Sequence, residues 1–267
     1  MQAKLSALEQ QLRSLGSVVV AYSGGLDSAF VLAIAHRTLA ERAVGLTAWS
    51  PSVPLRERED AARIAGLLGA RHLVVESHEL GDPRYAANPE DRCFYCKSEL
   101  YERTEQQRRE LGFAHVVNGT NVDDLRDYRP GLKAATAASV RSPLVDAGLH
   151  KHEIRALAKQ LGLDFWDKPA AACLSSRIPY GTAITKERLG QVERFEDALH
   201  GLGLRQVRVR HHERLARVEV AQDELETAFA ARQAIVAAGH GAGFTYVTLD
   251  LAGYRMGSLN AVLPVLR

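Results

Sequence analysis

The feature that most constrains the fold of this 267-residue chain is an apolar run, 18–22, that leads directly into a glycine-rich turn and a helical pattern. The turn, residues 23–28, reads Ser-Gly-Gly-Leu-Asp-Ser. Its glycines let a ligand approach the backbone closely, and the N–H groups at a helix start attract anions. Asp27 and Ser28 are residue types that cap helices, so we expect the next element to open there. The stretch predicts a phosphate-binding loop.

The spacing of this turn distinguishes two kinds of nucleotide chemistry. It lacks the spacing and the lysine of Gly-x-x-x-x-Gly-Lys-Ser/Thr, so hydrolysis of a γ-phosphate is not indicated. The turn is similar instead to the SGGxDS loop of the ATP pyrophosphatases, which hold the pyrophosphate of ATP and transfer AMP to a substrate. The alternative is a strand-to-helix turn that binds nothing. The succession of strand, turn and helix start favours the phosphate site.

Short apolar runs alternate with helical patterns along the first part of the chain. This alternation predicts an α/β fold: a parallel-sheet PP-loop domain, like the adenine nucleotide alpha hydrolases, with helices on both faces. Ligands of such sheets bind beyond the carboxyl ends of the strands, where Ser23 and the loop after Ala48 lie. The expected strands are 18–22, 43–48, 72–76, 115–118 and 140–144, and the expected helices are 2–15, 29–40, 56–68, 93–110 and 150–161.

The remainder of the chain has a different pattern, which predicts a second, smaller α+β domain. The expected elements there are helices 186–202 and 222–238, a hairpin of 206–211 with 215–220, and a strand at 244–249. We expect a PP-loop ATP pyrophosphatase domain over 1–166, a cysteine-bearing active-site loop over 167–185, and a C-terminal substrate and oligomerisation domain over 186–267.

A second segment is expected at the same sheet edge, where Asp123 and Asp124 follow the strand 115–118. Adjacent aspartates usually form a solvated turn. Their place after a strand beside a phosphate loop favours a magnesium site, with Asp124 as ligand to an ion that bridges ATP phosphates. The expected ATP-binding residues are Ala21, Ser23, Gly24, Gly25, Asp27, Ser28, Ala48, Gly119 and Asp124.

Composition excludes some classes of function. With 34 basic and 32 acidic residues, the net charge of +2 is too balanced for non-specific nucleic-acid binding by the whole chain. No apolar stretch is long enough to span a membrane, so no membrane partner is expected. Residues 1–5 follow an amphipathic helix pattern rather than that of a signal peptide, which predicts a cytoplasmic protein.

The three cysteines are too few and too unevenly placed for a disulfide framework. Cys93 and Cys96 form a C-x-x-C pair at a helix head, and Cys173 lies in an irregular segment whose length suggests a functional loop. Zinc would need a histidine as fourth ligand, and a redox dithiol lacks its usual context. Three cysteines can also hold three irons of a 4Fe–4S cluster and leave one iron open. Three unrelated thiols are the remaining possibility.

Four segments together resemble the LarE family, and the match covers nearly the whole chain. They are residues 23–28, 119–124, 173–181 and 250–260, of which the last two are the more specific. LarE proteins are ATP-dependent sulfur transferases that make the pyridinium bisthiocarboxylate mononucleotide, later loaded with nickel as the cofactor of lactate racemase. The resemblance implies that a substrate carboxylate attacks the α-phosphate of ATP, and that sulfur then displaces AMP.

The resemblance also implies where the sulfur comes from. In single-cysteine members the residue matching Cys173 gives up its own sulfur. Cys93 and Cys96 match a subgroup in which three thiols hold a 4Fe–4S cluster that carries transferable sulfide. The implied cofactors and partners are ATP, Mg²⁺, the cluster, a small-molecule mononucleotide, and sulfide or a sulfur donor. Family members also tend to form homo-oligomers, in particular hexamers.

A carboxylated mononucleotide requires cationic recognition. Arg208 and Arg210 alternate along a strand and share a face, which suits a phosphate clamp, although arginines on edge strands are often solvated. The expected catalytic residues are Cys173, Arg177 and Lys97, and the expected substrate-binding residues are Arg208, Arg210 and Ser176. Glu196 and Asp223 are candidates for a second metal site. A solvated helix face is the favoured interpretation of Glu196.

Three other functions are compatible with parts of this pattern. A tRNA thiolase pairs a similar loop with a three-cysteine cluster, but the charge balance and the lack of an RNA-binding module argue against it. An amide-forming synthetase of the NAD or GMP type would use ammonia, and the cysteines would then be irrelevant. A nucleotide-binding regulatory protein without catalysis is disfavoured by the intact loop and Asp124.

Overall fold

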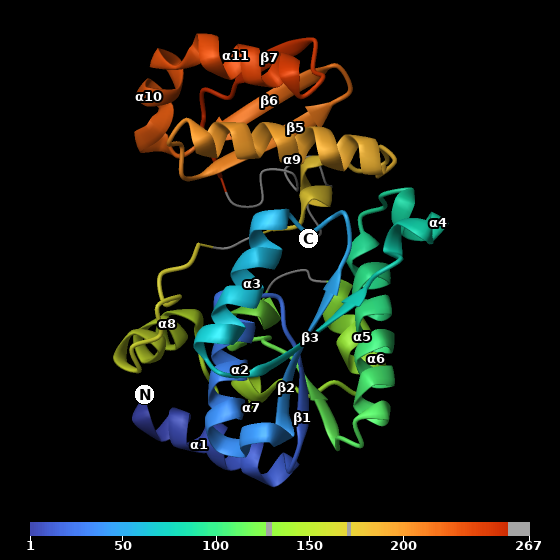
Figure 1. Ribbon diagram of the computed structural model, residues 1–267, viewed down its shortest axis with the longest axis vertical. Helices are drawn as coiled ribbons and strands as arrows, with labels where there is room; N and C mark the ends of the chain where they lie inside the picture. The colour runs from blue at the N-terminus through green and yellow to red at the C-terminus, as the bar shows by residue number, and fades with distance from the viewer. Residues whose placement is uncertain (127–129, 170–171, 256–267) are drawn as a thin grey trace. The chain divides into compact units, whose positions relative to one another are not determined.

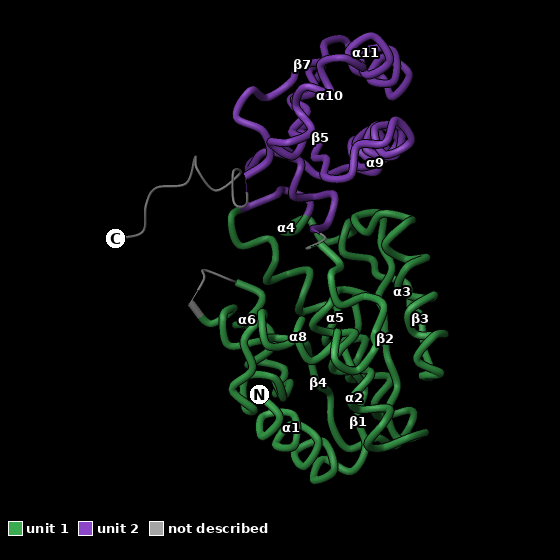
Figure 2. Tube along the Cα trace, turned by 90° about the vertical axis from the view of Figure 1, so that its left-hand side faces the viewer, with its two compact units in different colours: residues 1–85, 90–171 green, residues 86–89, 172–267 purple. Residues whose placement is uncertain are grey.

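The computed structural model describes residues 1–126, 130–169 and 172–255 (Figure 1). The chain forms two compact units, which Figure 2 colours separately. Unit 1 comprises residues 1–85 and 90–171, and unit 2 comprises residues 86–89 and 172–267. No sequence pattern indicated that residues 86–89 belong with the C-terminal part.

Unit 1 is built on a four-stranded parallel sheet of order β3-β2-β1-β4, which confirms the predicted α/β class. The strands are β1 (Val18–Ala21), β2 (Ala43–Trp49), β3 (Arg71–Glu76) and β4 (His115–Val117). The helices are α1 (Gln2–Leu15), α2 (Leu26–Leu39), α3 (Leu55–Leu67), α4 (Pro83–Ala86), α5 (Arg92–Glu110), α6 (Pro130–Ala137), α7 (Pro143–Asp146) and α8 (Lys151–Gln160), with short 3-10 helices η1 (Ala40–Arg42), η2 (Glu79–Gly81) and η3 (Val122–Arg126).

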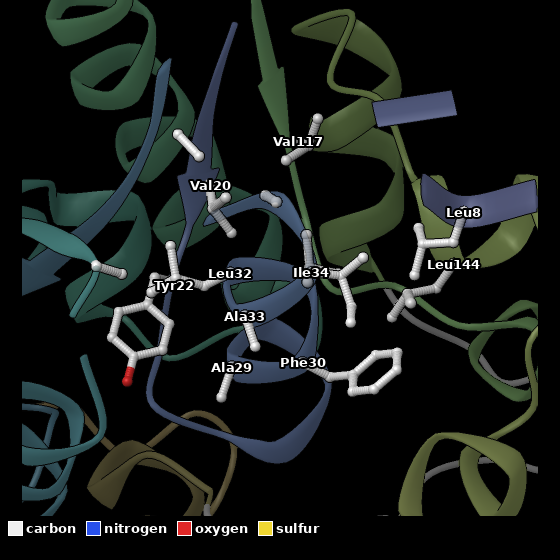
Figure 3. Close-up of a cluster of buried hydrophobic side chains, with 14 of the residues drawn as sticks. Leu8, Val20, Tyr22, Ala29, Phe30, Leu32, Ala33, Ile34, Val117 and Leu144 are labelled. Carbon is white, nitrogen blue, oxygen red and sulfur yellow. The ribbon is translucent and has the colours of Figure 1, made fainter. Parts of the chain in front are cut away.

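The central strand β1 is packed on both faces because its side chains alternate. Val20 joins the cluster formed with α2, in which Figure 3 shows Ile34 together with Leu8 of α1 and Leu144 of α7. Val19 points to the opposite face, where hydrophobic residues of α5 cover the sheet. The phosphate loop therefore leaves a fully buried strand and enters a helix that is buried along most of its length.

Two details of unit 1 differ from the sequence-based expectation. The strand predicted at 140–144 is wrong: Arg141 makes a single parallel bridge to Val117, and α7 begins at Pro143. Proline has no N–H for a strand ladder and suits the first turn of a helix. The capping role predicted for Asp27 and Ser28 is also wrong, because α2 begins at Leu26 with extended Gly25 as its N-cap.

Unit 2 is an α+β unit with a three-stranded sheet of order β5-β6-β7. Strands β5 (Val207–His212) and β6 (Leu215–Val220) form the predicted antiparallel hairpin, and β7 (Tyr246–Leu249) pairs parallel to β6. Its helices are α9 (Lys186–Gly201), α10 (Leu225–Ala230) and α11 (Arg232–Gly241), with 3-10 helices η4 (Leu174–Arg177) and η5 (Gln222–Glu224).

The single helix predicted over 222–238 is wrong, because the structure divides it. The Glu224 carboxylate accepts the backbone N–H groups of Arg205 and Gln206, at 2.8 and 3.1 Å, at the point where η5 ends and α10 begins. Ala231, with ψ near 9°, then separates α10 from α11. In the part of the chain that is described, no helix is both long and apolar enough to cross a membrane.

Candidate functional site

The loop between β1 and α2 is packed tightly against its neighbours, and glycine is required at two positions of this packing, Gly24 and Gly119. Gly24 has φ +73°, and a Cβ there would lie 2.7 Å from the Cβ of Ala61 in α3. A Cβ on Gly119, in the loop after β4, would lie 2.6 Å from the backbone nitrogen of Ser28. The start of α2 is therefore in direct backbone contact with the second predicted site segment.

Two serines fix the shape of this phosphate loop. The Ser28 hydroxyl accepts the Ser23 backbone N–H at 3.1 Å and donates to the Gly25 carbonyl at 3.1 Å. The hydroxyls of Ser23 and Ser28 are 3.0 Å apart. The first N–H groups of α2 lack partners within the helix, as at every helix start. The loop thus offers a preformed set of donors to an anion.

A lysine that sequence reasoning missed reaches this loop. Lys151, the first residue of α8, places its Nζ 2.6 Å from Oδ2 of Asp27. The other carboxylate oxygen of Asp27 is buried and has no hydrogen-bond partner among the described residues. No local signal marks Lys151, because a lysine at the start of an amphipathic helix is ordinarily solvated.

The two adjacent aspartates after β4 differ in their contacts. Asp123 accepts from the Lys151 backbone N–H at 2.8 Å and lies 2.7 Å from Nδ1 of His150, so it ties its loop to α8. Asp124 accepts the Asn121 backbone N–H at 3.1 Å. Asp124 is half-buried, and a carboxylate at this edge suits a magnesium ion.

The loop after β2 is braced by a buried glutamate. The Ser50 hydroxyl donates to Oε1 of Glu79 at 2.6 Å, and the Ser52 hydroxyl donates to the same oxygen. Glu79 is only 4% exposed. This bracing fixes the backbone that follows Ala48, where we predicted a nucleotide contact. Glu79 lies in a polar, irregular stretch of sequence, which gave no signal for it.

Cys93 and Cys96 lie on the first turns of α5. Residues three apart on a helix share a face, so the two thiols project to the same side. Cys93 is exposed and Cys96 half-buried, and neither they nor Cys173 take part in a disulfide. Lys97 packs beside α6, since a Cβ on Gly131 would lie 2.9 Å from its Cγ. A pocket of about 390 Å³ is lined by residues of η2, α4 and α5, among them Phe94 and Tyr95.

In unit 2, Arg177 organises the segment that carries Cys173. Its guanidinium binds the Glu196 carboxylate through two bonds of 2.9 and 2.8 Å, and it donates to the Cys173 carbonyl at 2.9 Å. The Ser176 hydroxyl donates to the same carbonyl at 2.8 Å. Arg177 is 1% exposed, so its contacts are those of a buried clamp.

The solvated position favoured for Glu196 is wrong, because the residue is 2% exposed. Burial by itself would raise the pKa of Glu196, yet the Arg177 cation and the hydrogen bonds hold it below its usual value. Its Oε1 also accepts the Val209 N–H at 2.8 Å. Both carboxylate oxygens of Glu196 therefore accept hydrogen bonds, from Arg177 and from the Val209 backbone. The side chain of Asp223 is 73% exposed and faces Arg205 at 3.6 Å.

Arg208 and Arg210 are also buried, at 5% exposure each, rather than solvated on an edge strand. Arg210 binds both oxygens of Glu219, at 3.0 and 2.7 Å, and donates to the Ser176 carbonyl at 2.9 Å. Arg208 lies 5.2 Å from the ring centre of Tyr254. Burial and the Arg177 cation lower the pKa of Arg208.

Lys168, a second residue that sequence reasoning missed, makes its contacts within unit 1. Its Nζ contacts Glu57 at 3.0 Å and Asp60 at 2.8 Å, both on α3. Its carbonyl accepts from Arg155 of α8 at 2.9 Å. Among the described residues, no three His, Cys, Asp or Glu side chains form a group that could hold a metal ion.

Comparisons with known proteins cover both units. A family model described as asparagine synthase matches residues 5–89. An uncharacterized protein of Synechocystis is 44% identical over 98% of this chain and 99% of its own length. The pyridinium-3,5-bisthiocarboxylic acid mononucleotide synthase of Lactiplantibacillus plantarum is 37% identical over 97% of this chain and 95% of its own. An uncharacterized protein of Methanocaldococcus jannaschii is 27% identical over 89% of this chain and 90% of its own length.

Proposed function

Because this chain belongs to the LarE family of PP-loop ATP-dependent sulfur transferases, we propose that it converts pyridinium-3,5-biscarboxylic acid mononucleotide into the thiocarboxylate form. The observation that carries the proposal is the near full-length similarity to the Lactiplantibacillus plantarum synthase, together with a preformed phosphate loop. The product of this reaction is the precursor of the nickel-pincer cofactor of lactate racemase.

The first half of the reaction is activation at unit 1. A carboxylate oxygen of the substrate attacks the α-phosphorus of ATP, the bond to the bridging oxygen breaks, and pyrophosphate leaves. Donors of residues 23–28 and the start of α2 stabilise the charge that develops on pyrophosphate. Asp124 is the proposed magnesium ligand, and Ala21, Ala48 and Gly119 lie at the same sheet edge. Positioning and charge stabilisation are the main requirements of such a step.

The second half exchanges oxygen for sulfur. A sulfur nucleophile adds to the carbonyl carbon of the acyl adenylate, and the bond to AMP breaks. We propose that unit 2 holds the substrate, with Arg208, Arg210 and Ser176 directed to its phosphate. The burial of Arg208 and Arg210 supports this, because a bound phosphate would form charge-assisted hydrogen bonds with buried guanidinium groups. Arg177 acts by holding the Cys173 carbonyl, and Lys97 is proposed to orient a substrate carboxylate.

On the family resemblance, we propose that Cys93, Cys96 and Cys173 hold a 4Fe–4S cluster. None of the three takes part in a disulfide, and the two on α5 share a helix face. When bound, such a cluster would supply an open iron site for sulfide. Family resemblance also supports sulfide or a sulfur donor as co-substrate, a cytoplasmic location and a homo-oligomeric assembly.

The proposed substrate is tested by pyrophosphate release from the anaerobically purified protein with ATP and Mg²⁺. Three acceptors are compared: the carboxylated pyridinium mononucleotide with sulfide, bulk tRNA with sulfide, and the mononucleotide with ammonia. We expect release to depend on the mononucleotide, and sulfur to enter the product. Release that needs tRNA would identify a thiolase of RNA, and an amide product would identify an ammonia-using ligase; either result contradicts the proposal.

A further inference from the structure

One basic side chain is held at the phosphate loop although no nucleotide motif includes it. The Nζ of Lys151 lies 2.6 Å from Oδ2 of Asp27, a contact between residues 124 positions apart in the chain. We propose that Lys151 is the pyrophosphate-binding cation of this site: it neutralises Asp27 when ATP is absent and donates to phosphate oxygens when ATP is bound. The proposal rests on the proposed function only in taking ATP as the ligand.

The backbone of Lys151 is fixed by the site itself. The carboxylate of Asp123, in the loop after β4, accepts the Lys151 N–H at 2.8 Å and contacts His150, the N-cap of α8. Glu153 closes this helix start by accepting the His150 N–H at 3.0 Å. The same loop contacts the start of α2 through Gly119. Lys151 is therefore attached to the two segments that form the phosphate site, and its side chain reaches across to the first of them.

The contacts around Asp27 indicate a ligand. Oδ1 of Asp27 and Nδ2 of Asn121 are buried and have no hydrogen-bond partner in the described part of the chain. Buried polar atoms are nearly always satisfied in native proteins, so a group from outside the chain is expected to contact them. Asn121 lies in the loop after β4, two residues beyond Gly119. A metal-bound triphosphate would offer both an acceptor for the amide and a cation for the carboxylate oxygen.

Lys151 has the charge and the access that a phosphate ligand needs. Its side chain is 38% exposed, compared with 18% for Asp27, so a solute can reach the ammonium group. An ammonium has three N–H donors, and the contact with Asp27 uses one of them. The loop lacks the lysine of Walker-type loops, and Lys151 contacts two carboxylates, Asp27 through its Nζ and Asp123 through its backbone N–H. Positive charge from α8 offsets the repulsion that these carboxylates would exert on a polyphosphate.

The test is ligand binding to the purified full-length chain, measured by isothermal titration calorimetry with Mg·ATP, Mg·pyrophosphate and AMP. We expect Lys151→Ala to weaken binding of ATP and pyrophosphate by tenfold or more, on the order expected for a lost charge-assisted hydrogen bond. Affinity for AMP should change less than twofold. The matched control is Lys4→Ala, which removes another lysine ion pair from α8, to Glu153 at 2.7 Å, away from the loop. It should bind all three ligands like the wild type.

Two results would overturn the proposal. One is binding of ATP and pyrophosphate by Lys151→Ala within twofold of the wild type; the other is an equal loss for AMP. Should the alanine variant not fold, Lys151→Arg and Lys151→Gln carry the same test, since arginine keeps the charge and glutamine does not. We expect the Lys151→Arg variant to bind pyrophosphate at least tenfold more tightly than the Lys151→Gln variant. Equal affinities of the two variants would refute the proposal. A protein that binds ATP through Lys151 but makes no thiocarboxylate would refute the proposed function alone.

Discussion

Arg177 and Glu196 form a two-bond ion pair inside unit 2, with Nε and Nη2 of the arginine 2.9 and 2.8 Å from the two carboxylate oxygens. The side chains are 1% and 3% exposed, so both charges are shielded from solvent. Because the same guanidinium also holds the carbonyl of Cys173, this pair fixes the cysteine segment to α9. The ion pair therefore links the stability of unit 2 to the position of the proposed sulfur site.

Breaking this pair should destabilise the protein strongly. We expect Glu196→Gln to lower the free energy of unfolding by about 3–5 kcal/mol, because it leaves the Arg177 cation buried without its counter-charge. Urea denaturation measures the change. The control is Asp197→Asn on the exposed face of α9, which should alter stability by less than about 0.5 kcal/mol. Equal stabilities of the two variants would mean that the pair does not hold unit 2 together.

The packing of the phosphate loop predicts a contrast between two glycines of unit 1. Gly119→Ala should weaken ATP binding by about tenfold or more and destabilise the fold by about 1–3 kcal/mol, because the new Cβ would lie 2.6 Å from the Ser28 backbone. Gly66→Ala, inside α3 with nothing within 4 Å, should be neutral or stabilising. Calorimetric titration with Mg·ATP and thermal unfolding measure both effects. Normal ATP affinity in Gly119→Ala would contradict the tight contact between the two loops.

Arg208 should act on the substrate rather than on ATP. Its pKa is lowered by burial and by the Arg177 cation, so a bound anion would relieve the cost of holding its charge. We expect Arg208→Ala to raise the KM for the mononucleotide by about tenfold or more while leaving that for ATP nearly unchanged. Arg205→Ala, whose side chain is 80% exposed, serves as control. Equal increases in both KM values would exclude a role as substrate clamp.

The proposed cluster on the three cysteines predicts iron and acid-labile sulfide in anaerobically prepared protein. Each of Cys93→Ala, Cys96→Ala and Cys173→Ala should lower both, because a cluster held by three thiolates loses a ligand in each variant. Intact mass after turnover gives an independent readout: an unchanged polypeptide mass is expected, whereas loss of one sulfur from Cys173 would identify a sacrificial donor. Full iron content in Cys173→Ala would contradict the proposed ligand set.

Local patterns predicted the parts of the site whose geometry is local. The turn at 23–28 is specified by its own glycines and by the strand and helix beside it, so its place at the sheet edge followed from the sequence. The strand predicted at 140–144 was wrong, because Pro143 interrupts an apolar run that otherwise has strand composition. The start of α2 was misplaced because Ser28 bonds within the loop rather than capping the helix.

Contacts that join distant segments could not be predicted in this way. Lys151 and Glu196 each lie on a helix with many charges, where a solvated side chain is the ordinary expectation. Their partners, Asp27 and Arg177, are 124 and 19 residues away, and only the folded chain brings them together. The burial of Arg208 and Arg210 likewise depends on segments that cover strand β5. The alternation of residue types along β5 does not indicate those segments.

We propose that ATP cleavage to AMP and pyrophosphate is coupled to exchange of oxygen for sulfur on a pyridinium carboxylate. The most direct measurement is mass spectrometry of the small molecules after anaerobic incubation with ATP, Mg²⁺, sulfide and the carboxylated mononucleotide. We expect a thiocarboxylate product, with one AMP and one pyrophosphate formed for each oxygen replaced. ATP consumption that leaves the mononucleotide without sulfur would contradict the proposal.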